Sequence, residues 1–227
     1  MSIEGKPAAM TTTVYSQSNI QDGVLPGSRR YGTQERRTEA SEMATTTRPA
    51  GGWTYEDLQR LPDDGKRYEI IEGELFEMPA PSYADQFASN MLHLLIAPAA
   101  IGLGQVALYS PLDLMLESGG NPVQPDLLVL ASAGDDPTGA HIRGVVPTFV
   151  VEILSPSNPA HDLVRKRRLY ELAGVPVYWI VSPEARIVEV LTLEGGEYKT
   201  HVRAGGHESV TSKALPSLTF AASAVFA

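Results

Sequence analysis

Residues 148–154 read Thr-Phe-Val-Val-Glu-Ile-Leu, and residues 177–181 read Val-Tyr-Trp-Ile-Val. Short apolar runs of this length are typical of central strands that are buried on both faces. Between the two runs, Asn158 followed by Pro159 favours a helix start, and Gly174 favours a helix stop. This part of the chain therefore predicts two central strands of a sheet and a helix that flanks it.

Further elements are predicted on both sides of this centre. Thr54 can cap a short helix together with Asp57, and the run 68–78 predicts two short strands that turn at Glu72-Gly73. An amphipathic helix is predicted from apolar residues at helical spacing, namely Phe87, Met91, Leu94 and Leu95. The other strand-like runs are 106–109, 112–117 and 126–130, and a C-terminal hairpin of 186–193 with 198–202. Together they predict an α/β or α+β fold with a mixed sheet flanked by helices.

Composition narrows the function classes. The chain has 227 residues, of which 43% are hydrophobic, so most of it can fold around a core. It has no cysteine, which excludes disulfides, zinc-thiolate sites and a thiol nucleophile. The net charge of −9 disfavours binding of nucleic acid by bulk electrostatics. The same acidity suits a site in which carboxylates hold a divalent cation.

The chain is predicted to divide into a disordered tail, residues 1–48, and one domain, residues 49–227. The tail has few apolar residues and no periodicity, and Met43 is an alternative start that would leave residues 1–42 outside the native protein. No secretory signal is recognised, so no export is expected. The uncharged run 86–112 is interrupted by proline and glycine and predicts a helix, a turn and a strand rather than a membrane span. We expect a cytoplasmic protein.

Two acidic residues stand beside predicted central strands. Glu152 shares a strand face with Val150 and Leu154, so its carboxylate needs a partner there: an ion pair, a metal or a raised pKa. Asp126 precedes the apolar run 127–130, where it could also cap a turn. Two carboxylates at the ends of adjacent strands would form a site for a hard cation. The simpler interpretation pairs Glu152 with a nearby arginine.

The helix after Glu152 carries Asp162, Lys166 and Tyr170 at intervals of four residues, which places them on one stripe. The simpler interpretation is a surface salt bridge between the first two. Alternatively, the Lys166 ammonium lies beside the carboxylates, where it can orient a water molecule or neutralise charge on a phosphate oxygen. Arg165, Arg167 and Arg168 flank it and either contact phosphate or line a solvated helix face.

The chain resembles the Uma-type putative restriction endonucleases of the PD-(D/E)XK nuclease-like superfamily over roughly residues 54–226. The resemblance rests on short motifs in the right order: Tyr68-Glu-Ile-Ile-Glu-Gly-Glu-Leu, Met78-Pro-Ala-Pro-Ser82, Gln124-Pro-Asp-Leu127, Phe149-Val-Val-Glu-Ile-Leu-Ser-Pro-Ser157 and Gly174-Val-Pro-Val-Tyr-Trp-Ile-Val181, with Asp162, Lys166 and Tyr170 between the last two. It implies a restriction-endonuclease-like core and hydrolysis of DNA phosphodiester bonds that depends on Mg²⁺, with Mn²⁺ as an alternative.

The resemblance also implies roles for single residues. Asp126 corresponds to the aspartate of the PD motif and Glu152 to the acidic residue of the (D/E)XK motif, and both would bind the metal. Position 154, where the motif has lysine, is Leu154, and Lys166 is expected to replace that lysine in catalysis. Glu74 is a further acidic position that contacts the metal through water, and Asp162 and Tyr170 support the site. The chain departs from many relatives at Asp85, where they have histidine.

Two function classes stay open at this stage. One is a metal-dependent endonuclease with DNA as substrate; because cutting both strands needs two sites or two events, a homodimer is compatible with it. The other is a catalytically silent nucleic-acid-binding or regulatory module with the same fold, which the missing lysine at position 154 and the acidic charge favour. A purely structural role, with both carboxylates in salt bridges, is the third interpretation.

Overall fold

The computed structural model describes residues 51–116, 122–132, 141–154 and 160–227, with side chains from residue 163 in the last range. The predicted tail, residues 1–48, and the predicted helix start at Asn158 and Pro159 lie outside these ranges. The elements are α1 (Tyr55–Gln59), β1 (Arg67–Ile71), β2 (Glu74–Met78), α2 (Tyr83–Ile101), β3 (Val106–Tyr109), β4 (Asp113–Met115), β5 (Pro122–Val123), β6 (Leu127–Leu130), β7 (His141–Arg143), β8 (Phe149–Ile153), α3 (Ala160–Ala173), β9 (Val177–Ser182), β10 (Ile187–Glu194), β11 (Glu197–Gly205), β12 (Ser209–Thr211), β13 (Thr219–Ala221) and the 3₁₀ helix η1 (Ala222–Val225).

The central feature is a six-stranded sheet with the order β11-β10-β9-β8-β6-β3. β8 and β9 are parallel, because α3 carries the chain back between them, and the other neighbours are antiparallel. The mixed sheet flanked by helices confirms the predicted fold class. Three smaller sheets accompany it: the β1-β2 hairpin, β5-β4-β7 and β12-β13.

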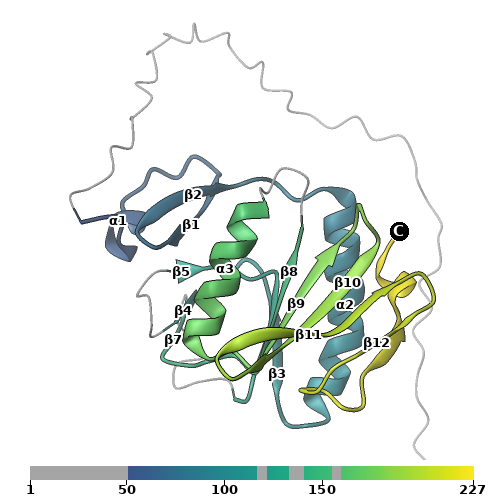
Figure 1. Cartoon of the computed structure of the whole chain (residues 1–227). Coiled ribbons are helices and arrows are strands. Elements are labelled where there is room, and N and C mark those ends of the chain that lie inside the picture. Colours follow the sequence, from purple (N-terminus) through teal and green to yellow (C-terminus); the bar gives the residue numbers. More distant parts are fainter. Residues whose placement is uncertain (1–50, 117–121, 133–140, 155–159) are drawn as a thin grey trace, which may run out of the picture. The chain divides into compact units, whose positions relative to one another are not determined.

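The two faces of the central sheet pack against different helices (Figure 1). On one face, buried residues of α2 contact alternate residues of β6, β8 and β9, among them Val151 and Trp179. On the opposite face, the other alternate residues, such as Val150 and Tyr178, pack against Tyr170 of α3. Since neighbouring residues of a strand point to opposite faces, both faces of these strands are buried, as their apolar runs predict.

The helix predicted from Phe87, Met91, Leu94 and Leu95 is present as α2, and Met91 and Leu95 pack against the core, but the centre of the buried face lies elsewhere. Its fully buried apolar residues are Ala88, Leu92, Ile96 and Ala100, whereas Leu94 is 57% exposed. Apolar residues surround most of this helix, so helical spacing alone does not show which face the sheet covers. Its start is a capping box: the Ser82 backbone N–H donates to the Asp85 carboxylate over 2.8 Å. This gives the departure at Asp85 a structural role.

The predicted ends of other helices and the predicted hairpin turn are confirmed. Thr54 and Asp57 form the predicted capping box of α1. The predicted hairpin is β1-β2, and both of its turn residues, Glu72 (φ 52°) and Gly73 (φ 72°), have the left-handed backbone that a two-residue hairpin turn requires. Gly174, in the same backbone region, ends α3 as predicted. None of the helices in the described ranges combines the length and apolar character needed to cross a bilayer.

Candidate active site

Glu152 is the acidic residue within β8, and the structure buries it with 4% of its surface exposed. It lies on the face that α3 covers. One carboxylate oxygen, Oε1, accepts a hydrogen bond from the Tyr170 hydroxyl at 2.6 Å, and the other, Oε2, accepts from Lys166 Nζ at 3.1 Å. Lys166 and Tyr170, two members of the predicted stripe of α3, therefore face inward. Pairing of Glu152 with an arginine, and a surface position for Lys166, are both wrong.

Lys166 joins Glu152 to a second buried carboxylate, that of Glu69 in β1. Its Nζ donates to Glu69 Oε1 at 3.0 Å, and the same oxygen accepts the Gln124 backbone N–H at 2.7 Å. The side chains of Glu69 and Lys166 are each 2% exposed. One ammonium group thus connects the β1-β2 hairpin, the central sheet and α3 away from water.

Asp126 immediately precedes β6. Because Leu127 pairs with Val151 in the antiparallel register, Asp126 falls beside Glu152 on the same face of the sheet. Its Oδ2 accepts the Ile153 backbone N–H at 2.7 Å, so it bridges two strand ends rather than capping a turn. The sheet thereby brings together the two carboxylates that were predicted to act jointly. We call Glu69, Asp126, Glu152, Lys166 and Tyr170 the carboxylate–lysine cluster.

The cluster contains more negative than positive charge. The pKa of Glu152 is raised to about 8, because burial disfavours the charged carboxylate and outweighs the opposing effect of Lys166; Asp126 and Glu69 add to the rise. Burial likewise raises the pKa of Asp126. For Lys166, burial favours the neutral amine, but the carboxylates of Glu152 and Glu69 outweigh it and hold its pKa above the ordinary value. Lys166 stays charged, and the carboxylates either share an extra proton or need another cation.

Tyr170 acts in the cluster as a neutral hydrogen-bond donor. Its pKa lies well above the ordinary value because burial, and then the Glu152 carboxylate, disfavour a phenolate. Together with Lys166 it fixes both oxygens of Glu152, so this carboxylate is held in one orientation. A fixed orientation is what a metal ligand or an acid–base group requires.

The donors of the cluster fit a hard divalent cation. Mg²⁺ prefers oxygen ligands and is commonly held by one or two carboxylates together with water, and Asp126 and Glu152 supply two carboxylates on one face. Within the described ranges, no group of three or more histidine, aspartate or glutamate side chains lies close enough together to hold a metal by itself. Two carboxylates plus water are therefore the arrangement that these residues allow.

Glu74, Asp162 and the arginines behave differently from the cluster. Glu74, in β2, pairs with Arg165 at 2.6 Å and its side chain is 43% exposed, so the structure gives it a surface ion pair instead of a contact with the cluster. Arg165 also lies over the Phe76 ring, and Arg167 donates to Glu171 and to the Tyr198 carbonyl. Asp162 was predicted to support the site, but its side chain lies outside the described part of the structure. Arg165, Lys166 and Arg167 are thus each paired with a carboxylate.

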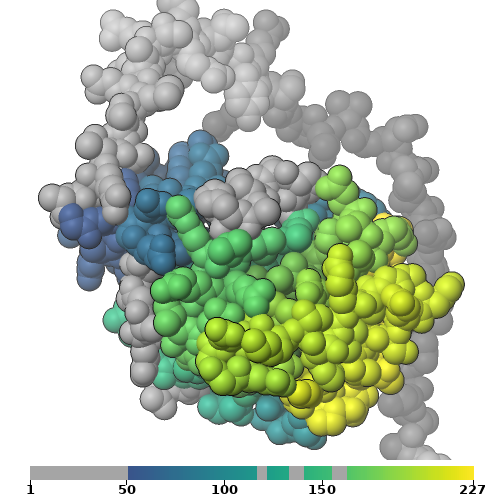
Figure 2. Space-filling view, in the orientation of Figure 1, coloured from purple at the N-terminus to yellow at the C-terminus, as the bar shows by residue number. Residues whose placement is uncertain are grey.

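Glu69 is the residue that sequence reasoning missed. The signal was present: in Arg67-Tyr-Glu-Ile-Ile71, Glu69 alternates with Ile71, which is buried. The same alternation argument that singles out Glu152 therefore applies to the hairpin. Figure 2 views the molecule from the side of α3, which is drawn in green beside the yellow-green β10–β11 hairpin.

Comparisons with known proteins concern the family and the fold of the chain. The model of the Uma2 family, described as a putative restriction endonuclease, matches residues 55–223. A crystal structure of a putative nuclease belonging to DUF820 from Anabaena variabilis superimposes with a TM-score of 0.60 at 18% identity, covering 76% of this chain and 97% of that one. At that identity the likeness shows a shared fold. A comparison with curated proteins finds no match.

Proposed function

This chain belongs to the Uma2 family of putative restriction endonucleases, and on that premise we propose that it hydrolyses phosphodiester bonds of DNA with the help of a divalent cation. Family membership supports a nuclease role. The dependence on a metal and the choice of DNA as substrate are the finer parts of the proposal. Asp126 and Glu152 would hold the cation, and Lys166 would act on water or on the phosphate.

The observation that carries the proposal is the convergence of Asp126, Glu152 and Lys166. These residues come from the position just before β6, from β8 and from α3, yet the antiparallel register sets the two carboxylates side by side, and Lys166 Nζ lies 3.1 Å from Glu152 Oε2. A fold that needed only stability would gain more from apolar side chains of similar volume. Retaining two acids and a lysine beneath a helix supports a chemical role for them.

Each residue has a task that its contacts support. When bound, the cation would supply Lewis-acid polarisation of a phosphate oxygen and a lowered pKa for water. Asp126 and Glu152 offer the oxygen ligands, and Tyr170 keeps Glu152 in its orientation. The ammonium of Lys166, held charged by its neighbours, can donate hydrogen bonds to an attacking water or to an oxygen on which negative charge develops. Because residue 154, where the motif has its lysine, is leucine, the lysine of this site would come from α3 instead of the end of β8.

The direct test is cleavage of supercoiled plasmid by the purified full-length chain with Mg²⁺ or Mn²⁺. Glu152→Ala should lower the rate by about a hundredfold or more, the scale seen when one group that stabilises a transition state is removed. Glu77→Gln is the matched control, because Glu77 is acidic, is exposed and pairs with Lys66 at the surface. Absence of cleavage for supercoiled, linear and single-stranded DNA would count against the proposal, as would equal rates for Glu152→Ala and the parent.

One observation favours the second candidate, a silent nucleic-acid-binding module. Both oxygens of Glu152 already accept hydrogen bonds, one from Lys166 and one from Tyr170, so the cluster is internally satisfied at this residue. Calorimetric titration with Mn²⁺ separates the two candidates. The nuclease should bind Mn²⁺ and lose binding in Asp126→Asn, whereas a silent module should bind DNA without any response to the metal.

A further inference from the structure

A cavity of about 290 Å³ lies beside β1, next to the carboxylate–lysine cluster. We call it the β1 cavity, and its lining includes Tyr55, Gln59, Lys66, Arg67, Tyr68 and Gln124. Gln124 connects the cavity to the cluster, because its backbone N–H donates to Glu69 Oε1, the oxygen that also accepts Lys166 Nζ. A molecule bound in the β1 cavity would therefore lie beside the carboxylates that are proposed to act on the substrate.

Arg67 gives the β1 cavity a cation that no carboxylate of the described residues neutralises. Its Nη1 donates to the Ser110 hydroxyl at 3.0 Å, whereas Lys66 of the same cavity pairs with Glu77 at 2.7 Å. The Ser110 backbone N–H in turn donates to the Asp126 carbonyl at 3.1 Å. Arg67 is thereby held close to Asp126, one of the two proposed metal ligands. A guanidinium group in this place suits a phosphate of the substrate strand, which arginine can bind with two parallel hydrogen bonds.

Two tyrosines give the β1 cavity a surface for a nucleobase. Tyr55 comes from α1 and Tyr68 from β1, and both line the cavity. The Tyr68 hydroxyl donates to Asp64 at 2.9 Å, and the Tyr55 ring lies edge-on to His141 with ring centroids 5.4 Å apart, so contacts hold both side chains in place. Proteins that bind single strands combine cations for the backbone with aromatic rings on which bases stack. The β1 cavity contains both kinds of group.

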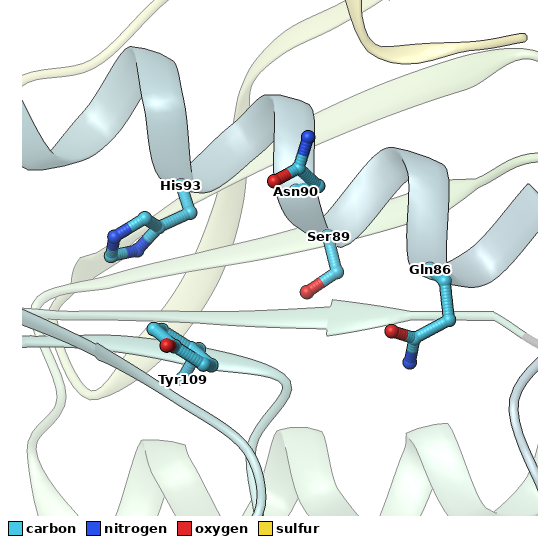
Figure 3. Close-up of a pocket in the computed structure, with 5 residues that line it drawn as sticks. All are labelled: Gln86, Ser89, Asn90, His93 and Tyr109. Atoms are coloured by element: carbon cyan, nitrogen blue, oxygen red, sulfur yellow. The ribbon is translucent and has the colours of Figure 1, made fainter. Parts of the chain in front are cut away.

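A second cavity, of about 200 Å³, lacks this combination. It lies between α2 and β3 and is lined by Gln86, Ser89, Asn90, His93 and Tyr109 (Figure 3). Tyr109 alternates along β3 with Ala107, which packs against the core on the α2 side of the sheet. This cavity is therefore on the side opposite to the carboxylate–lysine cluster. None of its five lining residues is an aspartate, glutamate, lysine or arginine, so it offers a phosphate no permanent positive charge.

We propose that the β1 cavity binds one unpaired nucleotide of the DNA strand that is cleaved, with Arg67 on its phosphate and Tyr55 and Tyr68 against its base. This proposal rests on the proposed function, because it places the substrate of that same site. A base that lies in a protein cavity is removed from its pair and its stack. The preferred substrate is therefore a single strand or a locally opened duplex. The cavity volume is close to the lower end of the range for small-molecule sites, which suits one nucleotide rather than a double helix.

Binding of a labelled single-stranded DNA oligonucleotide to the full-length chain tests the site. Fluorescence anisotropy in a chelating buffer measures affinity without cleavage. Arg67→Gln should weaken binding by about tenfold, the scale of a hydrogen bond to a charged group. It should also lower the slope of log affinity against log salt by about 0.7, the value for one phosphate contact on a single strand. Arg203→Gln is the matched control, because Arg203 is exposed on β11 near Glu189 and should change neither quantity.

Two further comparisons separate phosphate binding from a structural role of Arg67. Arg67→Lys keeps the positive charge and should retain the salt slope of the parent. Gln59 and Gln86 are both exposed, and each lines one of the two cavities, so their substitution leaves the core intact. Gln59→Glu should weaken binding several-fold because it places a negative charge beside the phosphate. Gln86→Glu makes the same change in the cavity of Figure 3 and should leave binding unchanged.

The proposal is overturned if the parent binds a duplex of the same sequence as tightly as the single strand, or if Arg67→Gln binds like the parent. Equal losses in Arg67→Lys and Arg67→Gln, or in Gln59→Glu and Gln86→Glu, would overturn it too. Plasmid cleavage with Mg²⁺ reports on the proposed function separately. Cleavage by a parent that fails these binding tests overturns the nucleotide site alone, whereas binding that depends on Arg67 in a parent that never cleaves overturns the hydrolysis alone.

Discussion

The two faces of the central sheet are built from the same strands but have opposite characters. In β8, Val151 points to the α2 face and joins a core made only of apolar residues. Its neighbour Glu152 points to the α3 face, where it accepts hydrogen bonds from Lys166 and Tyr170. Lys166 also donates to Glu69. One face gains free energy by removing apolar surface from water. The other face gives up part of that gain to bury charged groups.

The largest expected effect comes from breaking the charged face. Lys166→Met keeps the volume of the side chain but leaves the carboxylates of Glu69 and Glu152 without their cation. Removal of one partner of a buried ion pair costs about 3 to 5 kcal/mol of unfolding free energy, and urea denaturation measures it. Lys66→Met is the control: Lys66 pairs with Glu77 at the surface, and its loss should leave stability nearly unchanged. Equal stability of Lys166→Met and the parent would show that the cluster carries little uncompensated charge.

A somewhat smaller effect is expected on the apolar face. Leu92→Ala removes a fully buried side chain of α2 and should cost about 3 kcal/mol, because it leaves a cavity in a packed core. Cleavage per folded molecule should be unchanged, since Leu92 faces away from the carboxylate–lysine cluster. Exposed Leu172→Ala provides the comparison and should cost far less. A selective loss of cleavage in Leu92→Ala would mean that the two faces are coupled.

The smallest effect, counted per pH unit, is the change of unfolding free energy with pH. It arises from carboxylates of the α3 face and needs no substitution. The pKa of Glu152 rises from the ordinary 4.5 to about 8 on folding, so between these values the folded state binds more protons than the unfolded state. Unfolding free energy of the metal-free protein should therefore fall as pH increases through this window, by at most about 1.4 kcal/mol for each pH unit, and level off above it. Urea denaturation at several pH values in a chelating buffer measures the slope.

Glu152→Gln supplies the control for the pH prediction. The amide has nearly the same shape but does not titrate, so the fall in stability should become shallower in this variant. Groups whose pKa is lowered on folding, such as Asp57 and Asp64, act below this window and contribute equally to both proteins. Identical slopes for the parent and Glu152→Gln would place the titration elsewhere.

Much of the candidate site could be predicted from local sequence. Alternation along β8 identifies Glu152 as a buried acid, and the four-residue spacing of α3 places Lys166 and Tyr170 on one side. The same alternation marks Glu69 as a buried acid, but its contact with Lys166 could not be predicted, because the two residues lie 97 positions apart along the chain. Glu74 was expected instead, and its carboxylate pairs with Arg165. The metal-binding and catalytic roles of these residues remain predictions.

The sequence by itself determined the central strands β6, β8 and β9, the turn of the β1-β2 hairpin and the cap of α1, since these depend on backbone preferences and contacts within a few residues. It also determined that Glu152 would need a compensating partner. Only the tertiary structure decided that this partner is Lys166, that Glu69 rather than Glu74 lies beside it, and that α2 turns Leu92 inward and Leu94 outward. The physical reason is that apolar spacing limits which faces can be buried, whereas the packing of distant segments selects among them.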